Sequence, residues 1–172
     1  MKTLVQHIKE SMAPMKWHKP LQDQSNWAYE FLSSLDFSSD EMKVIKQLTS
    51  QNDVDAMVKS FIAGNDYVAK GEIHYATTFC IVLEGADDFT VYSRKIDSLY
   101  KKFNKVLKEI KRETGNKSIF DYTISKTDFP AKKDIYENNV LTVSCGIYST
   151  DTEKIKNAIS EIISIGKDED VL

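Results

Sequence analysis

The chain has 172 residues, of which 41% are hydrophobic and 28% are charged, and its formal net charge is −3 at pH 7. This composition is typical of one compact globular unit that can bury a core, and the net charge excludes a general DNA-condensing protein. No apolar run approaches the roughly 20 residues that cross a bilayer, and the N-terminus lacks the apolar core of a secretory signal. We therefore expect synthesis in the cytoplasm and no membrane partner.

The first twelve residues have the pattern of a short amphipathic helix. Leu4, Val5, Ile8 and Met12 share one stripe, and Pro14 prevents the helix from continuing. A helix of this length is unstable in water by itself, so we expect it to become ordered against a partner. We therefore expect that this segment can be removed without damage to the remaining domain.

The same segment resembles a targeting sequence of a known family. Met1-Lys2-Thr3, Ile8, Glu10 and Ser11 resemble the capsid-targeting leader of internal head proteins in T-even-like tailed phages. In that family the leader docks the protein into the prohead core, and a prohead protease cuts after an Ile/Leu-x-Glu tripeptide. The resemblance implies that residues 1–10 are a cleavable leader, with Ile8 opening the tripeptide and the cut between Glu10 and Ser11.

The resemblance also implies a location and a function. Internal head proteins lie inside the phage head beside the packaged DNA, and the implied function is delivery into the host to bind and inhibit a host or anti-phage defence factor. The residues leave an alternative open. In that alternative the N-terminal helix is docked on its own domain, and the chain is an intracellular, non-enzymatic α+β binding or regulatory module.

The region after the leader is predicted to be a linker followed by helices. Residues 11–26 contain two prolines and mixed polarity, which predicts an extended linker. The next part, 27–64, is predicted to be helical. An apolar stripe marks its first helix, a capping box at Ser38-x-x-Glu41 opens a second, and Asn52 opens a third that Gly64 ends.

Residues 71–165 are predicted to follow a β-α-β-β-α order. Alternating apolar and β-branched residues predict three strands, over 72–84, 118–126 and 140–149. An apolar stripe with helical spacing, about 24 residues long and ending before Gly115, predicts a long helix between the first two strands. A capping box at Thr150-x-x-Glu153 opens the last helix, and residues 166–172 are predicted to form a flexible tail.

This order of elements favours a single α+β domain over residues 27–165. We expect a three-stranded, largely antiparallel sheet with two helices packed on one face, similar to a truncated ferredoxin-like arrangement, behind a helical N-terminal region. The second face of the sheet then needs a cover. The N-terminal third could supply that cover or pack at the side, and a homodimer is the competing solution.

Catalytic motifs are missing or incomplete. His74 and Thr77 resemble one His-x-Thr motif of the two-histidine phosphoesterases, which place two such motifs around a phosphate. The spacing differs by one residue and the second motif is missing, so we predict no catalytic residues and a chain that is not an enzyme. A phosphoesterase acting through His74 and Thr77 is the alternative.

The sequence also predicts no metal site and no cofactor. It contains no phosphate-binding loop, no nucleophile elbow and no His-x-x-x-His spacing. Cys80 and Cys145 lie in strand-like apolar runs, which is typical of buried free thiols.

The polar face of the long helix is rich in cations. Its basic residues, with one that follows the helix, are Arg94, Lys95, Lys101, Lys102, Lys105, Lys108, Lys111, Arg112 and Lys117. Such a face can neutralise phosphates in a salt-sensitive, sequence-independent contact with nucleic acid. We assign this weak contact to Lys101, Lys102, Lys105, Lys108 and Arg112. The alternative is a solvated helix face that acidic residues elsewhere in the chain balance.

Overall fold

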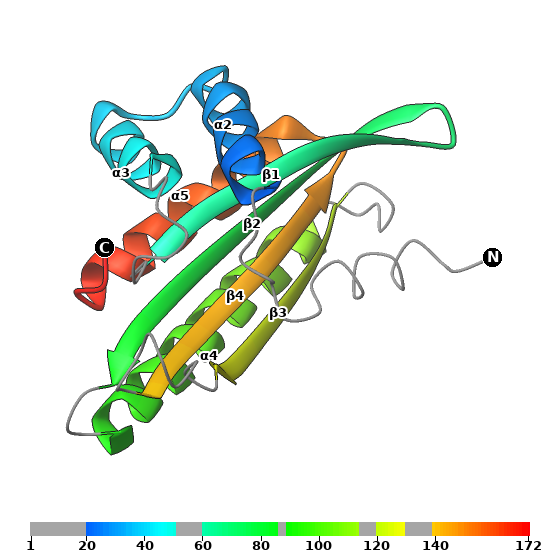
Figure 1. Cartoon of the computed structure of the whole chain (residues 1–172). Helices are drawn as coiled ribbons and strands as arrows, with labels where there is room; N and C mark the ends of the chain where they lie inside the picture. The colour runs from blue at the N-terminus through cyan, green and yellow to red at the C-terminus, as the bar shows by residue number, and fades with distance from the viewer. Residues whose placement is uncertain (1–19, 51–59, 86–88, 114–119, 130–138) are drawn as a thin grey trace.

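The computed structural model describes residues 20–50, 60–85, 89–113, 120–129 and 139–172 and has an α+β fold (Figure 1). The described elements are, in chain order, α2 (Pro20–Ser33), α3 (Ser39–Thr49), β1 (Ser60–Ala69), β2 (Glu72–Gly85), α4 (Phe89–Glu113), β3 (Phe120–Phe129), β4 (Asn139–Ser149) and α5 (Thr152–Asp168). The predicted fold class is confirmed, although the sheet has four strands instead of three.

The sheet has the strand order β1-β2-β4-β3, and each neighbouring pair is antiparallel. The three strands expected from the sequence correspond to β2, β3 and β4, with small differences at their ends. β1 and β2 form a hairpin whose turn places Lys70 at φ 53° and Gly71 at φ 79°. Positive φ values are the conformation that glycine adopts most easily, so Gly71 suits this tight turn.

β1 replaces the third helix that we expected to open at Asn52 and end at Gly64. Residues 51–59 lie outside the described part of the chain, but Ser60–Ala69 pairs with β2 along its whole length. The first five residues of β1 are all buried, so the strand lacks the alternation that would distinguish it from a helix. Gly64 lies inside this strand and does not end a helix.

The predicted linker over 11–26 also differs from the structure, because α2 begins at Pro20. Proline is favoured in the first turn of a helix, where its missing N–H would have no partner within the helix. The helix places Trp27 and Phe31 in a stack with Tyr75 of β2, with ring centroids 4.9 Å apart for Trp27 and Phe31 and 4.6 Å for Phe31 and Tyr75. Residues 11–19 lie outside the described part.

The C-terminal helix starts and ends differently from the prediction. Its N-cap is Asp151 and not Thr150, since the Asp151 carboxylate accepts hydrogen bonds from two backbone N–H groups of the first turn. We expected a flexible tail from residue 166, but α5 continues to Asp168. Beyond it, the Val171 N–H donates to the Gly166 carbonyl at 2.9 Å, and Leu172 packs near Gly166.

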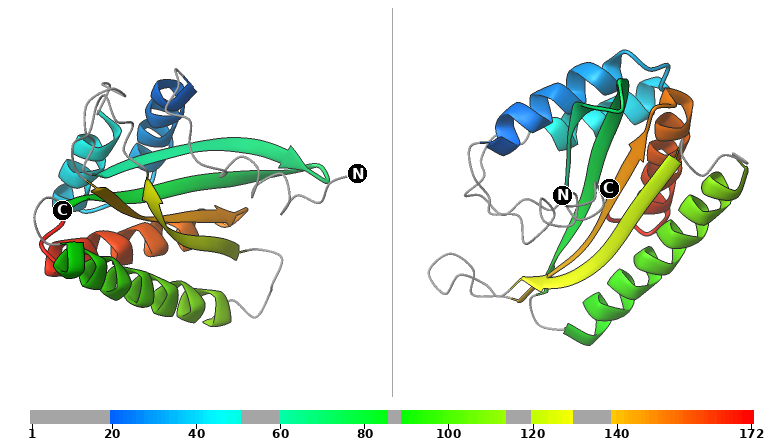
Figure 2. Two further views of the ribbon diagram at one scale, coloured as in Figure 1. Left: turned by 60° about the horizontal axis from the view of Figure 1, so that its bottom comes forward. Right: turned by 90° about the vertical axis from the view of Figure 1, so that its right-hand side faces the viewer.

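All four described helices pack on one face of the twisted sheet, because their buried side chains share one core cluster. α4 and α5 lie side by side (Figure 2), and α2 and α3 pack over β1, where α3 contacts α5. At the boundary between α3 and α5, the Glu41 carboxylate accepts a hydrogen bond from Ser160 while completing the predicted capping box with Ser38. The helical N-terminal region therefore packs beside α5 and leaves the second face without a described helix.

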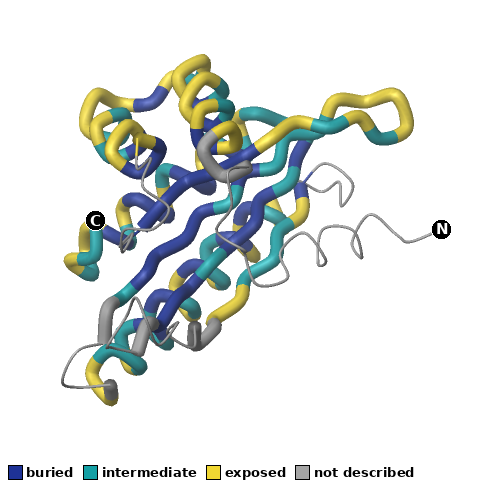
Figure 3. The backbone as a smooth tube through the Cα atoms, viewed as in Figure 1, coloured by how far each residue is buried: buried dark blue, intermediate teal, exposed yellow. Residues whose placement is uncertain are grey.

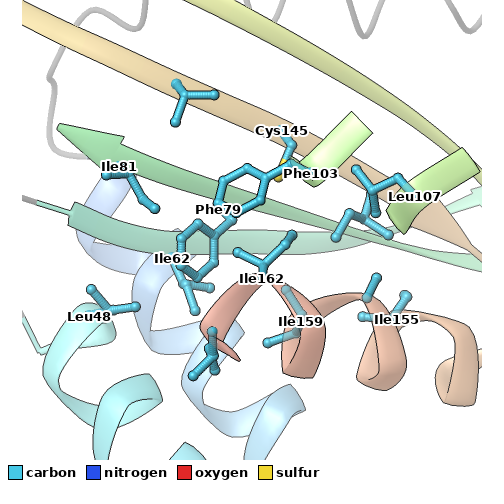
Figure 4. Packing of buried hydrophobic residues seen from close by; sticks show 14 of the residues in the cluster. Leu48, Ile62, Phe79, Ile81, Phe103, Leu107, Cys145, Ile155, Ile159 and Ile162 are labelled. Atoms are coloured by element: carbon cyan, nitrogen blue, oxygen red, sulfur yellow. The ribbon is translucent and has the colours of Figure 1, made fainter. Parts of the chain in front are cut away.

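One continuous hydrophobic core fills the space between this helix layer and the sheet (Figures 3 and 4). Phe79 of β2 meets Phe103 of α4 edge to face, with ring centroids 6.4 Å apart. Ile62 of β1 and Cys145 of β4 flank Phe79 in the sheet, and Ile159 of α5 packs into the same cluster. Edge-to-face ring pairs add to the stabilisation that comes from burial of apolar area.

Gly64 provides a test of how α2 docks on β1. A Cβ atom at this position would lie 2.6 Å from the Ala76 carbonyl oxygen and 2.9 Å from the Trp27 ring. We expect Gly64→Ala to lower the free energy of unfolding by about 1–3 kcal/mol, because the strand and helix must move apart. Urea unfolding measures this change, and Asn65→Ala, at the exposed neighbouring position, is the control. Equal stability of the two variants would contradict this close approach of α2 to β1.

Candidate nucleic-acid interface

Five cations of α4 form one line on its outer side. We call these residues the basic stripe: Arg94, Lys101, Lys105, Lys108 and Arg112. At 100° per residue their positions fall within about 60° of one another, opposite the buried side of the helix. The buried side consists of Ile96, Leu99, Phe103, Leu107 and Ile110. The first and last cations are 18 residues apart, so the stripe is about 27 Å long at 1.5 Å per residue.

Lys102, which we assigned to the same contact, lies on the flank of α4 and is not part of the stripe. Its ammonium group pairs with the Glu169 carboxylate at the end of α5. On the same flank, Lys95 Nζ donates to the Asp170 carbonyl at 3.4 Å. These two lysines connect α4 to the C-terminal turn, so their charges have partners within the chain.

The opposite flank of α4 is tied to β3 in a similar way. Lys111 pairs with Asp121 at 2.7 Å, and Lys126 of β3 pairs with Asp97 of α4. The hydrogen bond from Lys126 lowers the pKa of the Asp97 carboxyl group. Lys126 also lies 5.7 Å from the centre of the Tyr100 ring, a distance at which a cation and an aromatic face attract each other.

The basic stripe differs from both flanks in its exposure and its partners. All five of its side chains are exposed. Among the described residues, the ion pairs involve none of these five side chains. The stripe can therefore offer its charges to an external anion without breaking an ion pair of the described fold.

The other predicted site residues lie in β2 or outside the described part of the chain. The cleavage residues Ile8, Glu10 and Ser11 lie outside the described part of the chain. His74 and Thr77 are three residues apart in β2, so their side chains point to opposite faces of the sheet. The structure therefore does not bring His74 and Thr77 together around one phosphate.

The surroundings of these two side chains also differ. The His74 ring stacks on Tyr67, with centroids 5.3 Å apart, and its Nε2 lies 3.9 Å from the Glu72 carboxylate. Thr77 is fully buried in the core, where its hydroxyl has no hydrogen-bond partner among the described residues. A buried hydroxyl of this kind cannot reach a substrate from solvent.

Comparisons with known proteins add nothing to this geometry. No family model, curated protein or solved structure matches the chain. Within the described residues, no group of three or more His, Cys, Asp or Glu side chains could hold a metal ion. The helices described above include none that is both long and apolar enough to cross a membrane.

The basic stripe predicts a salt-dependent contact with DNA. We expect Lys101→Glu, Lys105→Glu and Lys108→Glu together to weaken retention on DNA at low salt, because three cationic contacts are replaced by repulsion. The slope of log affinity against log salt concentration should fall by about 3. Filter binding over a salt series measures both quantities, and circular dichroism checks that the fold is intact.

A matched variant controls for net charge. Lys46, Lys70 and Lys167 are exposed lysines on other elements, so replacing them with Glu changes the net charge equally without touching the stripe. We expect this control to keep most of the affinity and the original slope. An equal loss in both variants, or no loss in either, would mean that the stripe is solvated surface.

Proposed function

We propose that this chain is an internal head protein of a tailed phage, packaged with DNA and delivered to bind and inhibit a host or anti-phage defence factor. The observation that carries the proposal is the position of the Ile8-Lys9-Glu10 tripeptide, four residues behind Met1-Lys2-Thr3 at the N-terminus. Its partners during assembly are the prohead core and the prohead protease. In this proposal the protein is made in the host cytoplasm and then lies in the head interior.

The basic stripe supports packaging beside DNA. Duplex DNA carries one negative charge per about 1.7 Å of its axis, so a line of five cations about 27 Å long can meet several phosphates at once. The cut after Glu10 would remove two basic residues and one acidic residue, leaving 21 basic and 25 acidic residues. The mature chain is acidic overall, so the proposed contact with DNA depends on the local positive charge of α4 and not on the net charge.

The hairpin of β1 and β2 supports contact with a protein partner. β4 pairs with β2 only from Tyr75 onward, so the turn end of the hairpin projects beyond the four-stranded sheet (Figure 1). There Val68 and Ile73 lie opposite each other, 71% and 54% exposed. An exposed apolar pair on a projecting arm gains stability when another protein buries it.

The second candidate is an intracellular, non-enzymatic α+β binding or regulatory module whose N-terminal helix belongs to its own fold. The apolar residues Leu4, Val5 and Ile8 favour it, because they suit docking on any apolar surface, including this domain or a second copy of it. The two candidates differ in whether the N-terminal residues are removed.

The start of the mature chain tests the proposal. We expect intact-mass and N-terminal peptide analysis of purified phage particles to find a chain that begins at Ser11, because the prohead protease cuts after Glu10. The uncut chain in lysates of cells infected with protease-deficient phage is the control. A full-length chain that is absent from the particles would contradict packaging and favour the second candidate.

A further inference from the structure

The two edge strands of the sheet, β1 and β3, differ in how their edges are protected. On β3, Lys126 pairs with Asp97 of α4, and Asp121 pairs with Lys111 of the same helix. Charged side chains on an edge strand are a common protection against pairing with a strand of another chain. The ion pairs that join β3 to α4 would have to rearrange before a further strand could add there.

The outer end of β1 is an open edge. β1 pairs with β2 as far as Ala69, and no other described strand lies beyond β1. Alternate residues of an edge strand direct their N–H and C=O groups away from the sheet, so residues 65–69 can accept one more strand. They belong to residues 65–74, which we call the arm. The arm includes the part of the hairpin that projects beyond β4, and its residues are mainly exposed (Figure 3).

The charges of the arm fit a second arm in one antiparallel register. Residues directly opposite each other in an antiparallel pair point to the same face, so a two-fold pairing of β1 with itself is centred on a residue. A centre at Val68 places this valine beside its own copy, and on both sides of the axis it places Asp66 opposite Lys70 of the second copy. Among the described residues, the ion pairs involve neither Asp66 nor Lys70. Both charges are therefore available to a second copy.

The neighbouring registers lack this fit. A centre at Asp66 places two aspartates opposite each other, and a centre at Ala69 places Asp66 opposite Glu72. A centre at Tyr67 places Asp66 beside Val68, where the carboxylate has no cation opposite it. Like charges that are directly opposite destabilise a pair of strands, whereas opposite charges stabilise it. The charges of the arm therefore select the register centred on Val68.

The same register buries the apolar side chains that the arm exposes. Val68 is 71% exposed, and Ile73, which lies opposite it in β2, is 54% exposed. Pairing around Val68 forms a row of four apolar side chains, two from each copy, across about 14 Å at the usual spacing of strands. On the other face of the arm, Tyr67 lies opposite the small Ala69 of the second copy. Burial of the apolar row stabilises the pair.

We propose that the arm is a self-association surface, on which β1 pairs antiparallel with β1 of a second copy of this chain, centred on Val68. The pairing joins the two sheets into one. It involves five residues of each β1 strand, fewer than the roughly 20–30 residues per side of a standard interface, so we expect a weak dimer that dissociates on dilution. A second copy is then the protein that buries the arm, whether or not the chain is packaged in a phage head.

A charge exchange tests the register. Asp66→Lys places lysines opposite Lys70 of the second copy, and Lys70→Asp places aspartates opposite Asp66. We expect each single variant to weaken the dimer about tenfold or more, because two attractive pairs become repulsive. In a mixture of the two variants, each pair at these positions joins a lysine and an aspartate, so we expect a heterodimer with about the native affinity. Sedimentation equilibrium over an about hundredfold range of protein concentration measures these affinities.

Matched variants control for net charge. Asp36→Lys and Lys46→Asp change the charge by the same amounts at exposed positions outside the arm, and neither should change the dimer. Three results would overturn the proposal. They are a native chain that stays monomeric over the whole range, single arm variants that dimerise as well as the native chain, and a mixture that associates no better than the single variants.

Chemical cross-linking gives an independent measurement. Val68→Cys places two thiols directly opposite each other at the axis, whereas Ile73→Cys places them about 14 Å apart. We expect a short bis-methanethiosulfonate reagent to link two copies of the first variant and not of the second. The native chain under the same treatment controls for Cys80 and Cys145. Equal linkage of the two variants would contradict the register.

These measurements use the full-length chain without DNA or phage particles. Failure of the dimer therefore leaves the proposed function untouched, because a monomer can still be packaged and cut after Glu10. A chain that is absent from phage particles can equally still dimerise through the arm, so the two proposals fail separately.

Discussion

The contact between Phe79 and Phe103 is the interaction on which the rest of the fold depends. Phe79 lies in a central strand, between Ile62 of β1 and Cys145 of β4, and its ring meets Phe103 of α4 edge to face. One side chain therefore joins three strands and the longest helix. Large-to-small replacements in such positions cost several kcal/mol in other proteins, since the neighbouring residues cannot all collapse into the cavity.

Local patterns in the sequence predicted most of the elements and missed one strand. β2, β4 and α4 have a clear period of two or of 3.6, and the capping box at Ser38 marks the start of α3. β1 was missed because its first half is buried on both faces, and because its pairing with β2 joins Ile62 to Phe79 across a hairpin. The helix layer depends on such contacts between distant residues, which periodicity does not show.

The sequence predicted which cations lie on α4, but it did not predict which of them are free of ion pairs and which contact other parts of the fold. The partners of Lys95 and Lys102 are 75 and 67 residues away, so only the fold shows that these two lysines belong to the C-terminal turn. The placement of His74 and Thr77 on opposite faces of the sheet, in contrast, follows from their spacing in the sequence. An odd spacing in a strand places two side chains on opposite faces, and that rule alone argues against a joint role.

The placement of the basic stripe gives the molecule an electrical polarity. The chain has a net negative charge, but five of its cations form one line on the outer side of α4. A polyanion attracted to this line would meet the molecule with α4 toward it. The sheet face opposite the helices then points away from the anion, and a protein bound to DNA through α4 would approach other molecules with that face first.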